Sequence, residues 1–162
     1  MKRRKLKISF KFNYLVIPFI VFAVAWAGSI LTQKGMEWYK TINLPVWTPK
    51  GSFIGLVWTI IFILSVISLL IVWNKVKRKN IFWWIILFFV INAGLNLFWS
   101  ELFFANHQIG WAVFGAGLLE VTVLALIGLT SRVAPIASAL LIPYAAWVGF
   151  AMYLNYIIWM MN

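Results

Sequence analysis

The chain has 162 residues, of which 64% are hydrophobic, 19% are aromatic and 10% are charged. This composition is too apolar for an ordinary soluble domain and favours an integral membrane protein with one domain. The formal net charge of +11 could indicate nucleic-acid binding, but the basic residues are clustered beside apolar runs. Such clusters are typical of cytoplasmic flanks that also attract anionic lipid headgroups. We therefore expect membrane lipids as partners and no nucleic acid.

Residues 1–13 form a basic N-terminal segment, which we expect to be cytoplasmic. The apolar run 14–31 is the first predicted span, about 27 Å long as a helix and just sufficient to cross a bilayer. A secretory signal peptide is the alternative, because Ala25-Trp26-Ala27 before Gly28 resembles a cleavage site. The run is longer than the core of a usual signal peptide, so a span is the favoured interpretation.

Residues 32–51 form the only long polar connection, and they contain Trp38, Tyr39 and Trp47. These amphipathic aromatics are consistent with an aromatic belt at the membrane interface. A lid over a cavity is the second interpretation, and the sequence does not decide between the two.

The second predicted span is 52–73, and Thr48 and Pro49 are expected to supply its N-cap and its first helical residue. Gly51 and Gly55 stand four residues apart at its beginning. This spacing predicts the close approach of another helix backbone.

The third predicted span is 81–104, with Asn80 as its expected N-cap. Asn92, Asn96 and Trp99 fall on one face of this helix, at a depth where polar groups are costly without partners. Hydrogen bonds between helices and contact with a ligand are both open interpretations of the two amides.

The fourth predicted span is 110–129, and Glu120 lies within it. That carboxyl group could relay protons or pair with Arg132, and the sequence leaves its role open. His107, in the preceding loop, is the only histidine; a lone loop histidine is more often solvated than a ligand of iron.

The fifth predicted span is 135–159. Pro143 lacks an amide hydrogen, so we expect the helix to bend there. Beyond the bend, helical spacing places four residues on one face, which we interpret as a binding wall: Tyr144, Trp147, Ala151 and Leu154. The sequence thus predicts an all-α membrane protein, a bundle of five transmembrane helices.

Charge counts predict the orientation of these spans. With the N-terminus inside, 11 Lys and Arg residues lie on the cytoplasmic side and three on the other. The positive-inside rule therefore places the N-terminus in the cytoplasm, and the C-terminus and 32–51 outside. We expect the membrane to be that of a bacterial cell.

The residues offer little support for an enzyme. The three acids have no paired spacing, one histidine cannot hold a metal alone, and no Gly-rich phosphate loop follows a strand. The abundant aromatics instead suit a pocket for a flat apolar ligand. Trp58, Trp99 and Trp147 would supply its stacking faces, and Asn92 and Asn96 its polar groups.

Three ordered motifs carry a resemblance to a known family: Pro45-x-Trp47-x-Pro49 with Gly55-x-x-Trp58-Thr59; Leu95-Asn96-x-x-Trp99-Ser100-x-x-Phe103-Phe104; and Leu140-Leu141-Ile142-Pro143-Tyr144-x-x-Trp147-x-x-Phe150-Ala151-x-x-Leu154-Asn155. Together they resemble the TspO/MBR family, also called the translocator protein, tryptophan-rich sensory protein or peripheral-type benzodiazepine receptor family. The resemblance covers 14–160, which would form a single domain.

The resemblance implies a five-helix bundle, often a homodimer, that acts as a membrane receptor or sensor. Its pocket would open under the first loop and bind a tetrapyrrole such as protoporphyrin IX or haem, with no cofactor required and no metal site. The positions that match the family's ligand contacts are Trp38, Tyr39, Pro49, Trp58, Phe62, Asn92, Asn96, Trp99, Trp147 and Ala151.

Two alternatives accompany this expectation. Some members are reported to promote light-dependent porphyrin breakdown, and the tryptophans implicated there match Trp58 and Trp147. Transport of porphyrin or other small hydrophobic ligands is the other alternative. The sequence departs from the family where Lys50 follows Pro49 in place of a second proline. No basic residue follows Tyr156, so sterol recognition is poorly supported.

Overall fold

The computed structural model describes residues 11–162, so most of the predicted basic segment 1–13 lies outside the described residues. The described part contains helices and no β-strand, and its elements are α1 (Asn13–Tyr39), α2 (Gly51–Lys75), α3 (Asn80–Ser100), the π-helical turn η1 (Glu101–Ala105), α4 (Ile109–Ser131), α5 (Pro135–Ala139) and α6 (Ile142–Met161). Within residues 11–162, five helical stretches are long and apolar enough to cross a membrane. The predicted all-α, five-span architecture is confirmed.

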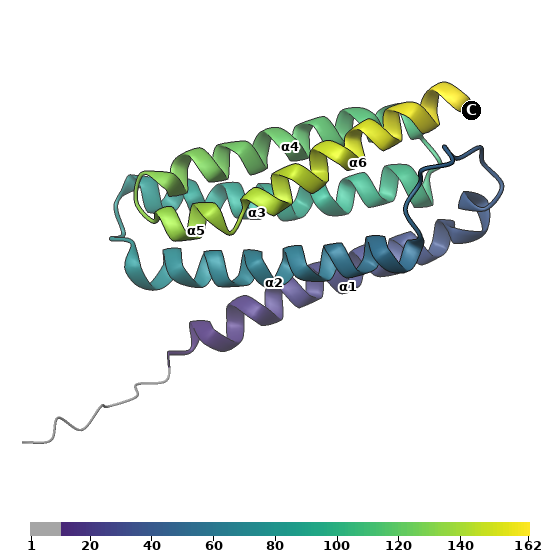
Figure 1. Cartoon of the computed structure of the whole chain (residues 1–162). Helices are drawn as coiled ribbons and strands as arrows, with labels where there is room; N and C mark the ends of the chain where they lie inside the picture. The colour runs from purple at the N-terminus through teal and green to yellow at the C-terminus, as the bar shows by residue number, and fades with distance from the viewer. Residues whose placement is uncertain (1–10) are drawn as a thin grey trace, which may run out of the picture.

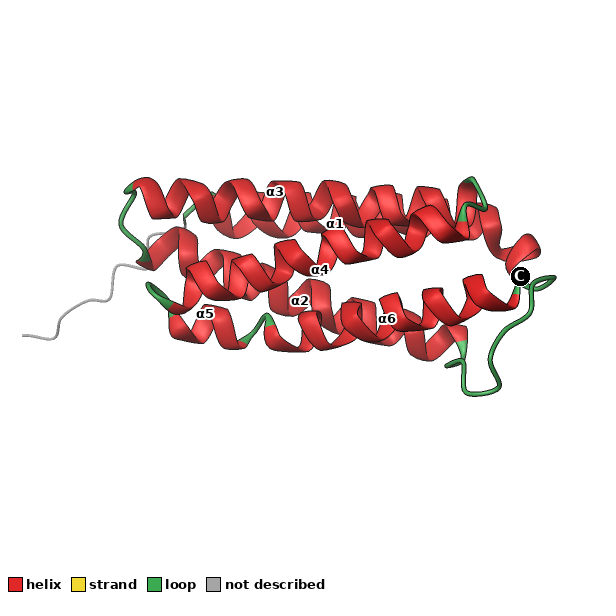
Figure 2. Cartoon of the chain, turned by 90° about the horizontal axis from the view of Figure 1, so that it is seen from above, coloured by secondary structure: helices red, strands yellow, loops and turns green. Residues whose placement is uncertain are grey.

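The helices form a closed ring in which α1 contacts α2 and α3, α4 packs between α3 and α6, and α5 joins α2 to α4. Figures 1 and 2 show the long axes of the spans running roughly side by side. The α2–α3 connection and the beginning of α1 lie at one end, which we call the basic end (Figure 1). The C-terminus and the segment 40–50 lie at the opposite end, which we call the loop end.

The first helix is longer than predicted. The span 14–31 marks where the apolar run stops, but α1 continues to Tyr39. Its polar last turns remain helical through local bonds: the Thr32 hydroxyl donates to the Gly28 carbonyl at 2.9 Å, and Lys40 pairs with Glu37 at 2.7 Å. Hydropathy therefore marked the end of the apolar run and missed the end of the helix.

The two predicted N-caps are wrong. Helix α2 begins at Gly51, two residues after Pro49, and the Thr48 hydroxyl donates to the Pro45 carbonyl at 2.6 Å within the preceding turn. Helix α3 begins at Asn80 itself, so this side chain lies inside the helix and does not cap it. Neither helix has a side-chain cap bond, because each begins at the polar margin of a span, where water can satisfy its free amides.

The predicted bend at Pro143 is confirmed as a break. Helix α5 ends at Ala139, and Pro143 occupies the first turn of α6, where its missing amide hydrogen costs nothing. The break is visible in Figure 2 between α5 and α6. It separates the short helix at the basic end from the longer helix that reaches the loop end.

The predicted close approach at Gly51 and Gly55 is wrong for packing within the chain, because a Cβ atom at either position would meet nothing within 4 Å. The close approach occurs at Gly35, where a Cβ atom would lie 2.6 Å from the Phe104 carbonyl carbon. Helix α1 therefore packs backbone to backbone against η1 at the loop end.

Candidate functional site

A small cavity of about 50 Å³ lies between α2, α3, η1 and α6 toward the loop end; we call it the aromatic pocket. Its walls include the indoles of Trp58, Trp99 and Trp147, contributed by three different helices. The ring centroids of Trp58 and Trp99 are 6.2 Å apart with an interplanar angle of 32°. The pocket thus presents flat aromatic faces from separate elements toward one small volume.

The π-helical turn completes one wall of the aromatic pocket. Two local bonds close it: the Asn106 amide donates to the Glu101 carbonyl at 2.9 Å, and the Gln108 amide to the Leu102 carbonyl at 2.8 Å. Phe103 and Phe104, within this turn, both line the pocket. Such π turns often occur at functional sites because the extra residue re-aims neighbouring side chains.

Three buried donors in the pocket walls have no hydrogen-bond partner among residues 11–162. They are the indole nitrogens of Trp99 and Trp147 and the amide nitrogen of Asn155. A buried donor without a partner costs about 1–3 kcal/mol, and native proteins contain few of them. Acceptor atoms of a bound molecule or of water could satisfy these three donors.

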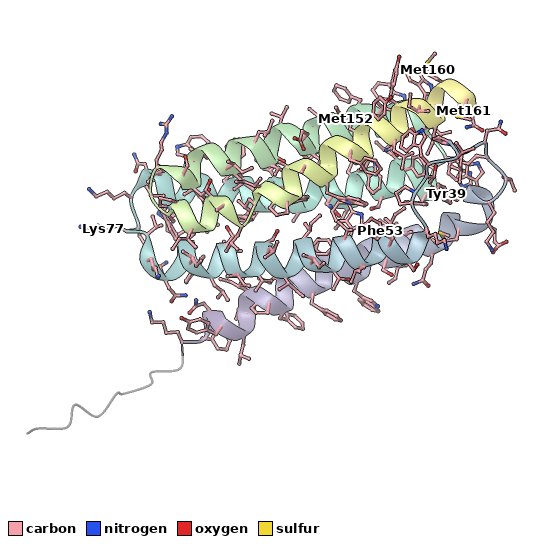
Figure 3. All side chains as sticks on the ribbon, viewed as in Figure 1. Tyr39, Phe53, Lys77, Met152, Met160 and Met161 are labelled. Atoms are coloured by element: carbon pink, nitrogen blue, oxygen red, sulfur yellow. The ribbon has the colours of Figure 1, made fainter. Side chains whose placement is uncertain are left out.

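The end of α1 roofs the pocket. Tyr39 lines it directly, and Figure 3 shows this residue at the loop end near the end of α6. Trp38 lies behind the wall, where its ring contacts Phe103 edge to face at 5.6 Å and stacks on His107 at 4.2 Å. His107 has a positive φ of 57°. His107 thus lies in the turn after η1, with its ring stacked on Trp38.

The segment 40–50 is fastened over the end of α6. The backbone amide of Asn43 donates to the Asn162 side-chain oxygen at 2.9 Å, and the Asn162 amide donates back to the Asn43 carbonyl at 3.0 Å. Trp47 stacks on Tyr153 at 5.9 Å with an interplanar angle of 12°. These contacts lie on the exposed side of the molecule and could separate without disturbing the core.

The two predicted amides belong to a polar network between helices. Asn92 donates to the Thr122 hydroxyl at 2.9 Å and accepts from the Tyr144 hydroxyl at 2.9 Å. Asn96 donates to the same Tyr144 oxygen at 3.4 Å. The network ties α3 to α4 and α6. It shows that interhelical bonds, one of the two interpretations left open, are present.

A second and larger cavity, of about 720 Å³, lies on the other side of these amides, between α1, α2 and α3; we call it the wedge cavity. Phe62, Asn92 and Asn96 line it, as does Tyr144. The Trp58 ring lies 5.7 Å from Phe62 and 6.0 Å from Tyr144. Those side chains form the partition between the two cavities.

Eight of the ten predicted contact residues line one of the two cavities. Those that line the aromatic pocket are Tyr39, Trp58, Trp99, Trp147 and Ala151. Those that line the wedge cavity are Phe62, Asn92 and Asn96, whereas Trp38 and Pro49 line neither. The sequence reasoning did not select Asn155 or Phe150 as contacts, although both stand on the α6 face that includes Trp147 and Ala151.

Glu120 faces the interior of the bundle. One of its carboxylate oxygens is buried without a partner, and the other would lie 3.9 Å from a Cβ atom at Gly149. Among residues 11–162 the sole ion pair joins Lys40 to Glu37, so Glu120 does not pair with Arg132. The described residues also contain no group of three metal-binding side chains.

Comparisons with known proteins agree with this architecture. The model of the TspO/MBR family matches residues 16–160. Tryptophan-rich protein TspO of Bacillus cereus is 30% identical over 152 residues, which cover 94% of this chain and 98% of that protein. Tryptophan-rich protein TspO of Chlorobaculum tepidum is 38% identical, covering 86% of this chain and 89% of that protein. The human translocator protein is 29% identical, covering 80% and 77%. The chain is therefore an integral membrane protein that belongs to the TspO/MBR family.

Proposed function

We propose that this protein is a membrane receptor or sensor that binds a tetrapyrrole, protoporphyrin IX or haem, in the aromatic pocket. The observation that carries the proposal is the set of three unpartnered donors, on Trp99, Trp147 and Asn155, between flat aromatic faces. A porphyrin has a flat apolar ring and propionate carboxylates. The indoles would stack on the ring, and the donors would bind the carboxylates.

The aromatic pocket would have to widen to admit a porphyrin. Pockets for ligands of this size measure about 300–1,000 Å³, and the aromatic pocket measures about 50 Å³. Helix α2 touches α6 at few points, and one such contact joins Phe53 to Trp147 at 6.2 Å. Separation of α2 from α6 along this line of contact, which we call the seam, would admit the porphyrin ring between Trp58 and Trp147.

Opening the seam would also displace the segment 40–50, because this segment leads into α2 and is fastened to the end of α6 through Asn43 and Asn162. A ligand that binds the open form would shift the population toward it. The exposed surface around Trp47 would then change with ligand occupancy. A partner protein at the loop end could detect this change in the surface around Trp47 and so respond to ligand binding.

The charges support the expected orientation. The described basic residues near the α2–α3 connection, Lys75, Lys77, Arg78 and Lys79, lie at the same end as Lys11, whose amine donates to Asn74 at 3.2 Å. The positive-inside rule then places the basic end in the cytoplasm and the aromatic pocket toward the external side. The ligand would enter from that side of the cell membrane.

Titration of the purified protein in detergent with protoporphyrin IX tests the proposal. We expect a saturable Soret-band shift and quenching of tryptophan fluorescence at one porphyrin per chain, because several indoles surround the pocket. Etioporphyrin, which lacks carboxylates, should bind about tenfold more weakly or worse, since losing one charge-assisted bond costs at least about 1.4 kcal/mol. A change that rises linearly without saturation, or equal binding of the two porphyrins, would contradict the proposal.

A further inference from the structure

Helix α1 is held tightly at one end and loosely at the other. At the loop end its backbone lies against η1 through Gly35. Along the rest of the helix, the sole buried residue is Ile17. Figure 1 shows the first turns of α1 diverging from the other helices toward the basic end. The wedge cavity occupies the space that this divergence leaves between α1, α2 and α3.

The wedge cavity is long, apolar and open to the side. It extends along α1 from Phe12 to Val24, about 18 Å at the rise of an α-helix. Two of its lining residues on neighbouring helices, Ile20 and Val90, are 54% and 64% exposed, so the cavity opens between α1 and α3. In a membrane this opening faces lipid. Its occupant can therefore enter from the bilayer itself.

Two unpartnered polar atoms line the cavity. The amide nitrogen of Asn13 lies at the basic end, and the hydroxyl of Ser65 lies deeper, on α2. Ser65 is only 9% exposed. Neither atom has a hydrogen-bond partner among residues 11–162. A polar head group at the basic end could give the Asn13 side-chain amide its partner, whereas an apolar chain deeper in the cavity would leave the Ser65 hydroxyl without one.

The mouth at the basic end is cationic. Lys11 precedes Asn13 by two residues and donates its amine to Asn74 at 3.2 Å, and the Arg78 guanidinium lies 4.9 Å from the ring centroid of Trp73, which lines the cavity. The acids among residues 11–162 lie elsewhere: Glu37 and Glu101 are near the loop end, and Glu120 is in the middle of α4. An anionic head group at this mouth would meet positive charges and no described carboxylate.

From this arrangement we infer that the wedge cavity binds the acyl chain of an anionic amphiphile. The chain lies along α1 among aliphatic side chains, and its head group accepts hydrogen bonds from Asn13 and Lys11. A free fatty acid and an acidic phospholipid with one chain inserted share this chemistry. The site is separate from the aromatic pocket, because Trp58, Phe62 and Tyr144 stand between the two.

Native mass spectrometry of the full chain released from phosphatidylcholine nanodiscs tests the inference. The probes are palmitate, laurate, phosphatidylglycerol and neutral monopalmitoylglycerol. We expect one palmitate per chain, held at least about tenfold more tightly than the neutral amphiphile. Retention of phosphatidylglycerol in preference to palmitate would identify a bilayer lipid as the source. Equal retention of neutral and anionic amphiphiles would overturn the inference.

Two variants locate the site. Ser65→Leu fills the deep part of the cavity, so it should weaken palmitate binding about tenfold while leaving the shorter laurate nearly unaffected. Lys11→Gln changes an exposed side chain, leaves the fold intact, and should reduce the preference for anionic over neutral amphiphiles. Ser29→Leu is the control: it introduces the same serine-to-leucine change at an exposed position of α1 outside the cavity. It should leave the binding of every amphiphile unchanged. Palmitate binding that is unaltered in both variants would overturn the inference.

The outcome is independent of the proposed tetrapyrrole function. Ser65 and Lys11 do not line the aromatic pocket, so both variants should titrate with protoporphyrin IX as the wild-type protein does. Loss of palmitate with intact porphyrin binding supports two separate sites. Displacement of palmitate by equimolar protoporphyrin IX would show one shared site and would contradict the inference.

Discussion

Replacing Trp147 with alanine is expected to weaken protoporphyrin IX binding by about 10- to 100-fold. Stacking of an aromatic side chain on a flat heterocycle contributes about 1–3 kcal/mol, and each 1.4 kcal/mol is a factor of about ten in Kd. Trp147 supplies both a stacking face and one of the unpartnered donors, and its ring centroid lies 5.3 Å from that of Phe150, which also lines the pocket. The measurement is Kd from the Soret-band shift.

One further variant separates stacking from hydrogen bonding, and a second is a control. Trp147→Phe keeps an aromatic face and removes the donor, so its Kd should lie between those of the wild-type protein and Trp147→Ala. Trp26→Ala is the matched control, because Trp26 is 63% exposed on α1 and lines neither cavity. Unchanged affinity in Trp147→Ala, or an equal loss in Trp26→Ala, would argue against stacking in the aromatic pocket.

Replacing Gly35 with alanine is expected to destabilise the protein and to weaken porphyrin binding together. A Cβ atom there would lie 2.6 Å and 2.7 Å from the carbonyl carbon and Cα of Phe104, closer than packed atoms tolerate. Backbone atoms cannot rotate away, so α1 and η1 must separate, at a cost of about 1–3 kcal/mol. Tyr39, one turn later on α1, would then leave the roof of the pocket.

Thermal unfolding in detergent and porphyrin titration measure the two effects of Gly35→Ala. Gly94→Ala provides the control, because a Cβ atom at Gly94 meets nothing within 4 Å and alanine favours a helix. We expect the control to unfold at the wild-type temperature or slightly above it and to bind normally. If Gly35→Ala matched this control in both measurements, the tight contact between α1 and η1 would be disproved.

The sequence was sufficient for features that depend on local chemistry. The five spans follow from apolar runs whose lengths match the bilayer. The break before α6 follows from the missing amide hydrogen of Pro143. The shared face of Trp147 and Ala151 follows from helical spacing, and both residues line the aromatic pocket.

The remaining features depend on contacts between distant residues. Spacing showed that Gly51 and Gly55 could accept a close neighbour, but the neighbour of a glycine is decided by packing, and the close contact is at Gly35. The polarity of residues after Leu31 hid the continuation of α1, because a helix above the membrane surface needs no apolar run. The turn η1 had no recognisable signal in the sequence.

For Asn92 and Asn96, the sequence predicted the need for hydrogen-bond partners and the structure identifies those partners. Asn92 and Asn96 had to be paired at their depth, and helical spacing placed them on one face. It could not name their partners, which lie on other helices at Thr122 and Tyr144. Their contact with a ligand remains a prediction, and both buried side chains line the wedge cavity.

The most direct test of the tetrapyrrole site is a crystal structure with zinc protoporphyrin IX, in which anomalous scattering from zinc marks the centre of the ring. We predict one anomalous peak in the aromatic pocket, between Trp58, Trp99 and Trp147, with the segment 40–50 displaced from its contacts with α6. A peak in the wedge cavity beside Ser65, or no ordered peak at a saturating concentration, would contradict the proposed function.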